Sequence, residues 1–394
     1  MCKKVLVIGG GKWQVPIIQK AKELGHYVIC SNLYEDSVGF AYADESYVAN
    51  VLDTEMNLSI AKKVNPDAVI TDQSDIAVKT VAYVSETLGL KGIGTDIADL
   101  YTNKLRMRQE LNIPGLHHPQ YKICCSKQDV IDFFKSIQNA IIIKPLANQS
   151  SRGIYKIVSQ TDIETLFDIT MGFSINGQIL AEEYIGGFEL TVEGFKSKDD
   201  HTTLAVSKKS HYASLPSVAQ SLTYLNEFSD FDRYALEKIN DQLFDPLLFG
   251  ITHVEYKFYN GRFYLIEAAV RGGGTKISSH IIPMVSGVDV NRLLIEEALG
   301  KQPAVIQKRA EEKCVILKFF DFPVGKVAKI NGLDYLTNNV NIIDFDFEFK
   351  IGETISSPDD DRSRIGYYIA CADTEGELMK IVENVDKKVW IDYV

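Results

Sequence analysis

Two glutamates and an arginine in the second half of the chain have the side chains that phosphate chemistry uses. In HVEYKFYNGRFYLIEAAVRGGG, Glu255 and Glu267 flank an Asn-Gly pair, and Arg271 follows. Asn-Gly between alternating strands predicts a β-hairpin. A strict two-residue turn would put Glu255 opposite Ile266, whereas one β-bulge or a three-residue loop would put it opposite Glu267. We predict that shift, because two facing carboxylates can hold Mg²⁺ while the ion also binds substrate phosphates.

A second stretch, IIIKPLANQSSRGI, joins an apolar strand to a loop of small and polar residues. The strand ends in Lys144, and the loop contains Ser150, Ser151, Arg152 and Gly153. Such a loop can fold over a polyphosphate with backbone N–H and hydroxyl donors. Taken alone, the stretch also fits a solvated hairpin tip.

A third stretch, ILAEEYIGGFELTVE, places acidic residues on both sides of a Gly-Gly bend. Glu182 and Glu183 end an apolar strand, and Glu189 lies beyond the bend. An adenine needs backbone donors and acceptors at a chain crossing, and a ribose needs a carboxylate acceptor. Without the other stretches, these glutamates would be typical of a solvated sheet edge.

The N-terminal stretch VLVIGGGKWQVPIIQKAKELGHYV predicts a strand, a glycine turn and a helix. Its loop, Gly9-Gly10-Gly11-Lys12, lacks the third glycine of GxGxxG and the spacing and Ser/Thr of GxxxxGK[ST]. A tight turn that needs glycine for packing is the simpler interpretation. An anion at the helix N-terminus is the alternative.

The order of predicted elements changes along the chain. Up to about residue 95, strands alternate with helices, with KGIG as a short strand end, which predicts a doubly wound parallel sheet. From Tyr121 onward, strand pairs predict antiparallel sheet, and short strands with a final helix follow from about residue 305. We place the domain boundaries at 1–100, 101–190, 191–305 and 306–394.

Composition excludes several function classes. The formal net charge of 42 − 53 = −11 argues against a general nucleic-acid binder. No apolar run approaches the roughly 18 residues of a membrane helix, and the N-terminus enters a strand without a signal-peptide pattern. Six scattered cysteines without CxxC spacing favour a reduced intracellular protein. We therefore expect a cytoplasmic protein that acts on small molecules, not on nucleic acids or membranes.

Taken in order, these motifs resemble the ATP-grasp superfamily. An α/β domain, NKLRMRQELNIPG, IIIKP with its loop, EEYIGGFE, and VE before IEAAVR follow one another along the chain. The strand-rich C-terminal part is similar to that of carbamoyl-phosphate-synthase-like and L-amino-acid ligase members. The resemblance implies a multidomain α/β and α+β fold. The domains would be an N-terminal Rossmann-like domain, a small subdomain with a linker helix, a large subdomain with the metal site, and a C-terminal strand-rich part of the large lobe.

The resemblance also implies cofactors, ATP and Mg²⁺, with Mn²⁺ as an alternative ion. The residues that would bind ATP are Lys104, Lys144, Ser150, Ser151, Arg152, Gly153, Glu182, Glu183, Ile185 and Glu189. Lys104 and Lys144 would contact phosphates, the backbone of Glu183 and Ile185 would meet the adenine together with Glu182, and Glu189 would meet the ribose.

For the reaction itself, the resemblance implies that Glu255 and Glu267 bind the metal and that Lys144 and Arg271 are catalytic. The substrate edge is assigned to Gly10, Gly11, Lys12, Gly272, Gly273 and His280. One departure stands out, since the family's usual Asn two residues after the second glutamate is Ala269 here. Alanine has no side-chain oxygen, which leaves a second metal in doubt.

The implied activity is ATP-dependent ligation of a carboxylate to an amine or thiol through an acyl phosphate, with release of ADP and phosphate. An amino acid is a candidate substrate, and homodimers are common in the family. Bicarbonate activation to carboxyphosphate stays open as an alternative, as does ATP binding without catalysis, which Ala269 motivates. A nicotinamide-dependent oxidoreductase rests on the first loop alone and leaves Lys144, Glu255, Glu267 and Arg271 unexplained.

Two further stretches hold charged residues whose placement can be predicted. Lys208, Lys209 and His211 are predicted to lie in a solvated connection, with a place in the lining of the acceptor site as the alternative. The segment SPDDDRSRIGYY predicts an acidic turn from which Arg364 reaches inward.

Overall fold

The N-terminal domain is a doubly wound parallel sheet, as predicted. The computed structural model describes residues 2–146, 153–174, 176–198, 200–213, 215–302, 305–311, 313–357 and 360–394. The first sheet has the order β3-β2-β1-β4, with bounds β1 (Lys4–Ile8), β2 (Tyr27–Asn32), β3 (Glu45–Val48) and β4 (Ala68–Ile70). Val5 and Val7 pack on one face of β1, and Leu6 and Ile8 on the other, because side chains alternate along a strand.

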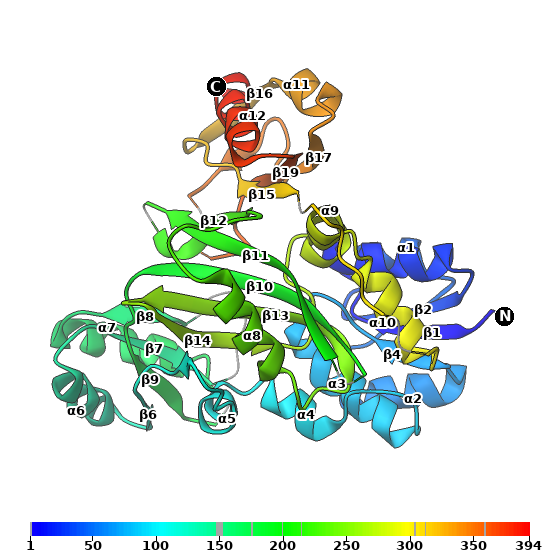
Figure 1. The fold of residues 1–394 in the computed structure, drawn as a ribbon, viewed down its shortest axis with the longest axis horizontal. Coiled ribbons are helices and arrows are strands. Elements are labelled where there is room, and N and C mark those ends of the chain that lie inside the picture. The colour runs from blue at the N-terminus through cyan, green and yellow to red at the C-terminus, as the bar shows by residue number, and fades with distance from the viewer. Residues whose placement is uncertain are drawn as a thin grey trace.

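Helices cover both faces of this sheet (Figure 1). One face packs against α1 (Val15–Glu23) and α10 (Val290–Ala298), and the other against α2 (Thr54–Val64) and α3 (Asp75–Thr87). Because α10 comes from much later in the sequence, it ties the N-terminal domain to the rest of the chain. Two short 3-10 helices, η1 (Lys12–Gln14) and η2 (Val38–Ala41), complete the domain.

The predicted strand at KGIG is wrong. Residues 91–94 form no strand and lead into α4 (Thr95–Leu100) and then α5 (Lys104–Glu110). Gly92 packs closely on α3, where a Cβ would lie 2.8 Å from Ser85 Cβ, and Gly94 has a φ of +83°. The chain therefore turns away from the sheet here instead of adding a strand to it.

A small antiparallel sheet follows, in the order β6-β9-β7-β8. Its elements are β6 (Tyr121–Cys124), α6 (Lys127–Ile137), β7 (Ile141–Pro145), β8 (Tyr155–Ile157), α7 (Gln160–Met171) and β9 (Ile179–Glu183). Helices α6 and α7 pack on it in one hydrophobic cluster. After β9 the chain crosses at Gly186 and Gly187 into the large sheet, so β9 and β10 belong to different sheets.

The large sheet runs through the centre of the molecule in the order β17-β19-β15-β12-β11-β10-β13-β14-β5 (Figure 1). Its strands are β5 (Leu116–His117), β10 (Phe188–Ser197), β11 (Asp200–Tyr212), β12 (Leu215–Tyr224), β13 (Phe249–Tyr259), β14 (Arg262–Ala269), β15 (Cys314–Phe319), β17 (Ile342–Phe347) and β19 (Gly366–Ala372). The helix α8 (Arg233–Leu243) packs against β11.

The β13–β14 hairpin contains the predicted bulge. Tyr259 pairs with Arg262 across the two-residue turn, and the register holds as far as the pair Tyr256–Leu265. Ile266 is then the extra residue, so that Glu255 pairs directly with Glu267. The two carboxylates therefore lie side by side on one face.

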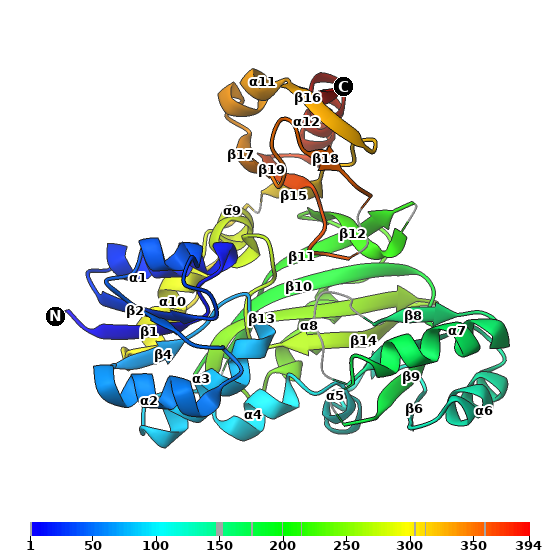
Figure 2. The same cartoon turned by 180° about the vertical axis from the view of Figure 1, so that it is seen from behind.

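The last part of the chain combines three strands of the large sheet with a further unit at the top of Figure 1, seen from behind in Figure 2. This unit contains α11 (Leu333–Asn338), α12 (Glu375–Lys388), β16 (Gly325–Asn331), β18 (Thr354–Ile355) and β20 (Trp390–Tyr393). Before it come the π-helix η3 (Ile277–Ile281) and α9 (Ile282–Ser286).

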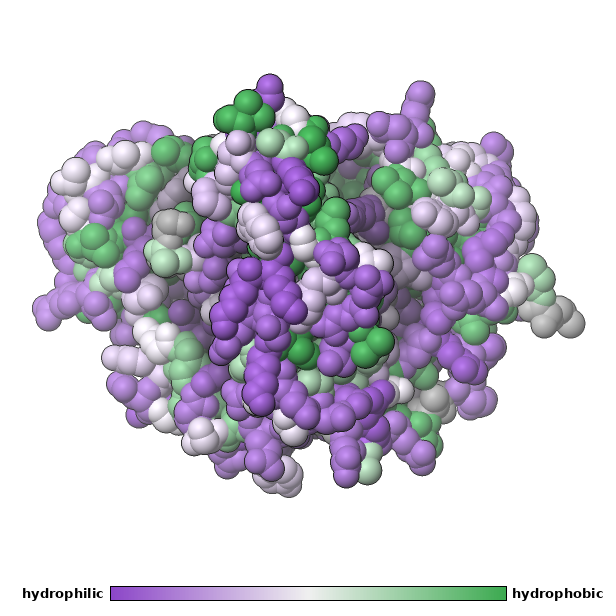
Figure 3. Space-filling model, turned by 90° about the horizontal axis from the view of Figure 1, so that it is seen from above, coloured by the Kyte–Doolittle hydropathy of each residue, from purple (hydrophilic) through white to green (hydrophobic). Residues whose placement is uncertain are grey.

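The view from above, onto this unit, shows mainly hydrophilic side chains, with hydrophobic ones in small separate groups (Figure 3). In the part of the chain that the structure describes, we find no helix with the length and hydropathy needed to cross a membrane.

A side chain at Gly187, where the chain crosses from the small sheet to the large one, should destabilise the folded protein. Gly187 has a φ of +74°, and a Cβ there would lie 2.0 Å from the carbonyl oxygen of Phe258. Gly177 has a similar φ of +72° but open space around it. We expect Gly177→Ala to lower the free energy of unfolding by about 1–2 kcal/mol, and Gly187→Ala to lower it by clearly more. Urea titration would measure both, and equal losses would contradict the clash.

All six cysteines are free thiols. Cys2 and Cys125 are exposed, whereas burial raises the pKa of Cys30 and of Cys124 to about 12 in each case. Because the thiolate is the reactive form, we expect a thiol reagent to label two cysteines rapidly in the native protein and all six in urea. Rapid native labelling of Cys30 would contradict this burial.

Candidate active site

A cavity of about 590 Å³ lies where the two antiparallel sheets, the N-terminal domain and the C-terminal part meet. We call it the central cavity. Its charged walls are formed mainly by Asp75, Lys104, Lys144, Glu182, Glu189, Lys209, Glu255, Glu267 and Arg271. Eight of these nine residues come from stretches that the sequence singled out or from their neighbours in the sheet, and Asp75 comes from the N-terminal domain.

The facing carboxylates of Glu255 and Glu267 each have a lysine beside them. Lys209 Nζ lies 2.8 Å from Glu255 Oε1, and Lys104 Nζ lies 2.8 Å from Glu267 Oε1. Burial alone would raise the pKa of Glu255, but the charges of Lys209 and His253 hold it well below its usual value. The carboxylate is therefore ionised at neutral pH, as a metal ligand must be.

The donor set at this point is small. Ala269 is buried and has no side-chain oxygen, and among the described residues no group of three or more His, Cys, Asp or Glu side chains converges in a way that could hold a metal ion. Two carboxylates with water and phosphate oxygens are the kind of ligand set that Mg²⁺ accepts. Glu255 and Glu267 therefore fit an ion that is also bound by a substrate.

A buried ion-pair network links the small sheet to the large one. Glu182 pairs with Lys144 at 2.5 Å and with Arg108 of α5 at 2.7 Å, and Arg108 also donates to the carbonyl oxygen of Ile266 at 2.7 Å. Burial would raise the pKa of Glu182, but Arg108 and Lys144 lower it to about 2. Burial lowers the pKa of Lys144 to about 8, against the opposing charge of Glu182.

Lys209 and His211 are not in a solvated connection, and this prediction is wrong. Both lie on β11, which pairs with β10, and both line the central cavity. Lys209 Nζ lies 3.3 Å from Glu189 Oε1, and His211 Nε2 lies 3.0 Å from Glu189 Oε2. The prediction failed because only the pairing of β11 with β10 brings these residues to the site. Lys208 does not line the central cavity and pairs with Asp230.

Arg271 is held by the N-terminal domain. Its Nε lies 2.8 Å from Asp75 Oδ1, and its Nη1 donates to the carbonyl oxygen of Gly272 at 3.0 Å. Burial opposes the charge on Arg271, but Asp75 raises the pKa of the guanidinium above its ordinary value. Arg271 is thus a fixed cation in the cavity wall.

The glycine loop after Arg271 packs on the loop between β4 and α3. The backbone N–H of Gly272 donates to Asp72 Oδ1 at 3.0 Å, and Ser278 Oγ donates to Asp72 Oδ2 at 2.5 Å. Asp72 is fully buried, and burial raises its pKa. A Cβ on Gly272 would lie 2.4 Å from Asp72 Oδ1, and one on Gly273 would lie 2.9 Å from His253 Nδ1. Both glycines therefore permit close packing rather than flexibility.

His253 lies beneath the carboxylates. Its Nδ1 is 2.9 Å from Oε1 of the buried Glu193, and its Nε2 is 3.9 Å from Glu255 Oε1. Burial would lower the pKa of His253, but the carboxylate of Glu193 raises it to about 9. The imidazolium adds a positive charge next to Glu255.

The structure does not bring every predicted residue to the central cavity. The predicted substrate residues that are not among its lining residues in the described part of the chain are Gly10, Gly11, Lys12, Gly272, Gly273 and His280. Lys12 Nζ instead pairs with Asp346 at 2.6 Å and Glu348 at 2.5 Å on the C-terminal side. Gly10 packs under Gly39, whose N–H donates to the Gly10 carbonyl at 2.8 Å. The N-terminal loop of Gly9, Gly10 and Gly11 is thus closely packed in this structure, as the simpler of the two interpretations expects.

The loop predicted to contact phosphates lies only partly within the described residues. Ser150, Ser151 and Arg152 lie outside the described residues, whereas Gly153 is buried with a φ of +71°. Glu183 and Ile185 line the cavity, as expected. Sequence reasoning missed Asp72, Gln73 and Asp75, for which the only signal was a polar run, TDQSD, after a buried strand.

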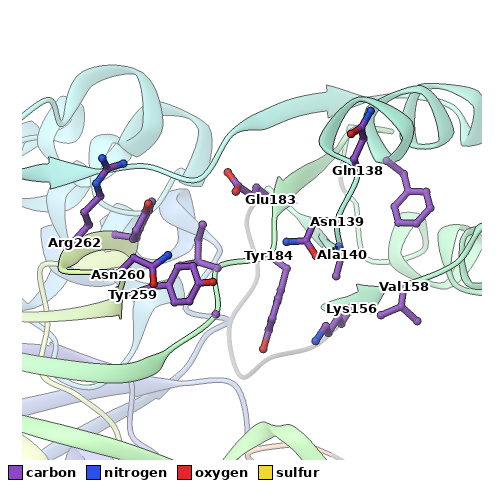
Figure 4. A pocket seen from close by; sticks show the side chains of 14 residues that line it. Gln138, Asn139, Ala140, Lys156, Val158, Glu183, Tyr184, Tyr259, Asn260 and Arg262 are labelled. Atoms are coloured by element: carbon purple, nitrogen blue, oxygen red, sulfur yellow. Dashed lines mark hydrogen bonds between the residues drawn. The ribbon is translucent and has the colours of Figure 1, made fainter. Parts of the chain in front are cut away.

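A second cavity, of about 940 Å³, lies between the small sheet and the tip of the β13–β14 hairpin (Figure 4). Tyr259, Asn260 and Arg262 line it from the hairpin tip, and Gln138 and Lys156 from the small sheet and its helix. Glu183, Tyr184 and Ile185 contribute to both cavities. The crossing segment is therefore a thin wall between them.

Comparisons with known proteins agree with this architecture. A family model described as an ATP-grasp domain matches residues 137–279, and one described as L-amino acid ligase C-terminal domain 2 matches residues 318–394. The formate-dependent phosphoribosylglycinamide formyltransferase of Sulfurisphaera tokodaii is 29% identical over 207 residues, which cover 50% of this chain and 51% of that protein. The chain spans about half the length of the curated relatives it matches.

Solved structures share the fold over the whole chain. The L-amino acid ligase of Bacillus licheniformis gives a TM-score of 0.84 at 19% identity, with 100% of this chain and 99% of that chain covered. The biotin carboxylase domain of the Hydrogenobacter thermophilus 2-oxoglutarate carboxylase, solved with MgADP, ADP and bicarbonate, gives 0.79 at 18% identity and covers 100% of this chain and 91% of that chain. The matched model shows that residues 137–279 form an ATP-grasp domain, and the solved structures show the fold that the whole chain shares with them.

Proposed function

We propose that this protein is an ATP-dependent ligase that joins a small carboxylate to an amine through an acyl phosphate. The observation that carries the proposal is the pair Glu255 and Glu267, which face each other across a bulged hairpin beside three cations, Lys104, Lys144 and Arg271. Phosphoryl transfer needs this combination, because negative charge spreads over the phosphoryl oxygens in the transition state.

ATP would lie along the central cavity between the two antiparallel sheets. The crossing segment at Glu183 and Ile185 offers backbone groups to the adenine, and Glu189 offers a carboxylate to the ribose. Lys144 of the small sheet and Lys104 of α5 both line this cavity, and Lys104 contacts Glu267 directly. Binding would require Lys104 to exchange part of its contact with Glu267 for phosphate oxygens.

In the first step, a carboxylate oxygen of the substrate attacks the γ-phosphorus of ATP. The bond from the γ-phosphorus to the β,γ-bridging oxygen breaks, and ADP leaves. Arg271, Lys104 and Lys144 offset the charge that develops on the phosphoryl oxygens. Mg²⁺ held by Glu255 and Glu267 would supply further charge neutralisation, with Mn²⁺ as an alternative ion.

In the second step, an amine nitrogen attacks the acyl carbon. The bond from that carbon to the phosphate oxygen breaks, inorganic phosphate leaves with the electron pair, and the nitrogen loses a proton to give the amide. Arg271, fixed by Asp75, remains beside the leaving phosphate. An amino acid is the preferred substrate class, supported by the L-amino acid ligase domain model over residues 318–394.

Bicarbonate activation is the second candidate for the same site. The biotin carboxylase domain of similar fold was solved with bicarbonate and MgADP, which is the specific observation in its favour. This reaction would use the same cations and the same pair of glutamates. Bicarbonate would take the place of the substrate carboxylate in the first step.

Phosphorus NMR of the purified protein with ATP and Mg²⁺ tests the proposal. One tube would hold pooled amino acids and a separate tube bicarbonate. We expect ADP and phosphate to accumulate in the amino-acid tube, and splitting the pool would then identify the substrate. Accumulation only with bicarbonate would favour the second candidate. Unchanged ATP in every tube, with ATP binding measured separately, would favour a protein that binds ATP without using it.

The same proposal includes a cytoplasmic location and a homodimer. Light scattering coupled to size-exclusion chromatography would measure the dimer, for which a mass near twice 44.1 kDa is expected.

A further inference from the structure

The crossing segment borders a second cavity that the proposed reaction does not use. This cavity, of about 940 Å³, is called the outer cavity below. Small-molecule sites have volumes of about 300–1,000 Å³, so it has room for a ligand of ordinary metabolite size. Glu183, Tyr184 and Ile185 separate it from the central cavity. A ligand there would lie beside the segment proposed to meet the adenine of ATP.

Two cations line the outer cavity without a carboxylate partner. Lys156 of β8 and Arg262 of the hairpin tip stand on opposite walls (Figure 4), and neither forms an ion pair with any residue that the structure describes. Glu183 is the one acidic residue among the described lining residues. In a chain with a formal net charge of −11, this local excess of positive charge favours an anionic ligand.

Aromatic rings line both walls of the outer cavity. They belong to Phe134, Tyr184, Tyr259 and Tyr264. Tyr184 and Tyr259 project into the cavity from the crossing segment and from the hairpin tip (Figure 4). Tyr259 packs closely on Gly186, where a Cβ would lie 3.2 Å from Tyr259 Cε2. A ring held in this way offers a flat face on which the base of a nucleotide can stack.

Side-chain amides complete the lining. Gln138 and Asn139 follow the end of α6, and Asn260 lies in the hairpin turn. Asn139 Oδ1 accepts from the N–H of Ala140 at 2.8 Å, which leaves its amino group to donate. An amide can donate and accept hydrogen bonds, as the polar edge of a base requires. Rings, amides and cations together match a nucleotide better than an inorganic anion or an apolar molecule.

We propose that the outer cavity is a second nucleotide site, in which the base stacks on Tyr259 and the phosphate pairs with Arg262. The site is separate from the one proposed for ATP. It has no catalytic role, because its described lining contains no pair of carboxylates to hold a metal ion. Its role is regulatory, through the wall that the two cavities share.

Tyr184 connects the two cavities. Lys156 Nζ lies 3.7 Å from the centroid of its ring, and Lys257 Nζ lies 5.7 Å from the same centroid. Lys257 lines the central cavity and also lies 3.9 Å from Glu189, which is proposed to meet the ribose of ATP. A nucleotide that draws Lys156 toward its phosphate would therefore disturb Tyr184 and change the affinity of the central cavity for ATP.

Calorimetry on the full-length protein tests the site without requiring turnover. The protein is first loaded with Mg²⁺ and a non-hydrolysable ATP analogue, which fill the central cavity, and AMP, GMP, CMP and UMP are then titrated in turn. We expect at least one of these mononucleotides to bind, with one molecule per chain. Arg262→Gln should weaken that binding about 10-fold, because a charge-assisted hydrogen bond is lost at an accessible site. Failure of every mononucleotide to bind would overturn the proposal.

Arg362→Gln is the matched control, because Arg362 is exposed, pairs with Asp360 and lines neither cavity. It should keep the wild-type affinity for the mononucleotide. Unchanged binding in Arg262→Gln would place the ligand elsewhere, for example in the central cavity. An equal loss in both variants would show a general effect of charge. Either result would overturn the site.

Tyr259→Leu distinguishes a nucleotide from a simple anion. It removes the ring on which the base is proposed to stack and keeps both cations, so mononucleotide binding should weaken about 10-fold while competition by inorganic phosphate stays the same. Tyr259 is exposed at the hairpin tip, so the fold should be unaffected. Equal mononucleotide binding by this variant and the wild type would show that the cavity accepts any anion, and would contradict the assignment.

The affinity for the ATP analogue tests the regulatory role. It is measured with and without the mononucleotide, and we expect a change of about fivefold or more in the wild type but little change in Arg262→Gln. Equal affinities in the wild type would overturn the coupling. ADP formation is assayed separately, so that a failure of the ligase function is distinguished from a failure of the outer site.

Discussion

Replacement of Arg271 by alanine is expected to lower ATP-dependent turnover by about 100- to 1,000-fold, the range found when one charge-stabilising donor is removed from an active site. Arg271 is the cation that both steps of the proposed reaction use. Asp75 and the carbonyl oxygen of Gly272 fix its direction, so no neighbouring lysine can take its place. The measurement is the steady-state rate of ADP formation.

Two controls separate the catalytic effect from loss of the fold. Arg292→Ala removes an exposed arginine that pairs with Glu296 on α10 and should leave the rate unchanged. Arg271→Ala also leaves Asp75 without its cation, so the double variant Arg271→Ala/Asp75→Asn should recover stability but not activity. A double variant with wild-type turnover would remove Arg271 from the mechanism.

Replacement of Glu267 by glutamine is the second large effect, with turnover again about 100- to 1,000-fold lower. Glutamine keeps the shape of the side chain and can still accept a hydrogen bond from Lys104, but it removes one of the two negative charges proposed to hold the metal. The concentration of Mg²⁺ needed for half-maximal rate should therefore rise, and excess Mg²⁺ should restore part of the activity.

Glu383→Gln is the matched control, because Glu383 is exposed on α12 and pairs only weakly with Lys387, at 3.5 Å. It should change neither the rate nor the Mg²⁺ dependence. If Glu267→Gln lowered the rate with no change in Mg²⁺ dependence at any concentration, Glu267 would act through Lys104 rather than through a metal.

The elements that the sequence predicted correctly are those that depend on residues close together in the chain. The alternation and glycines around β1 and α1 predicted the first sheet, and the Asn-Gly pair with its two glutamates predicted the bulged hairpin. Lys144 and Glu182 were predicted at strand ends, and both line the cavity. In each case the information lies within about twenty residues.

What sequence reasoning missed depends on contacts between distant strands. Lys209 reaches Glu255 only because β11 pairs with β10 and β10 with β13. Asp72 accepts a hydrogen bond from Gly272, which lies 200 residues later in the sequence. Nothing near Asp72 in the sequence indicates that partner. Lys12 was predicted at the substrate edge but does not line the cavity. Its ion-pair partners, Asp346 and Glu348, are more than 300 residues away in the sequence, so local patterns could not indicate them.

Arg108 links the proposed nucleotide site to the proposed metal site. One guanidinium contacts the carboxylate of Glu182 in the small sheet and the carbonyl oxygen of Ile266, the bulge residue next to Glu267. A nucleotide that shifts Glu182 through Lys144 would thus move the backbone beside Glu267, a proposed metal ligand. Thermodynamic linkage then requires reciprocity: the factor by which nucleotide tightens metal binding equals the factor by which metal tightens nucleotide binding. A buried arginine that touches neither ligand would set the size of that factor.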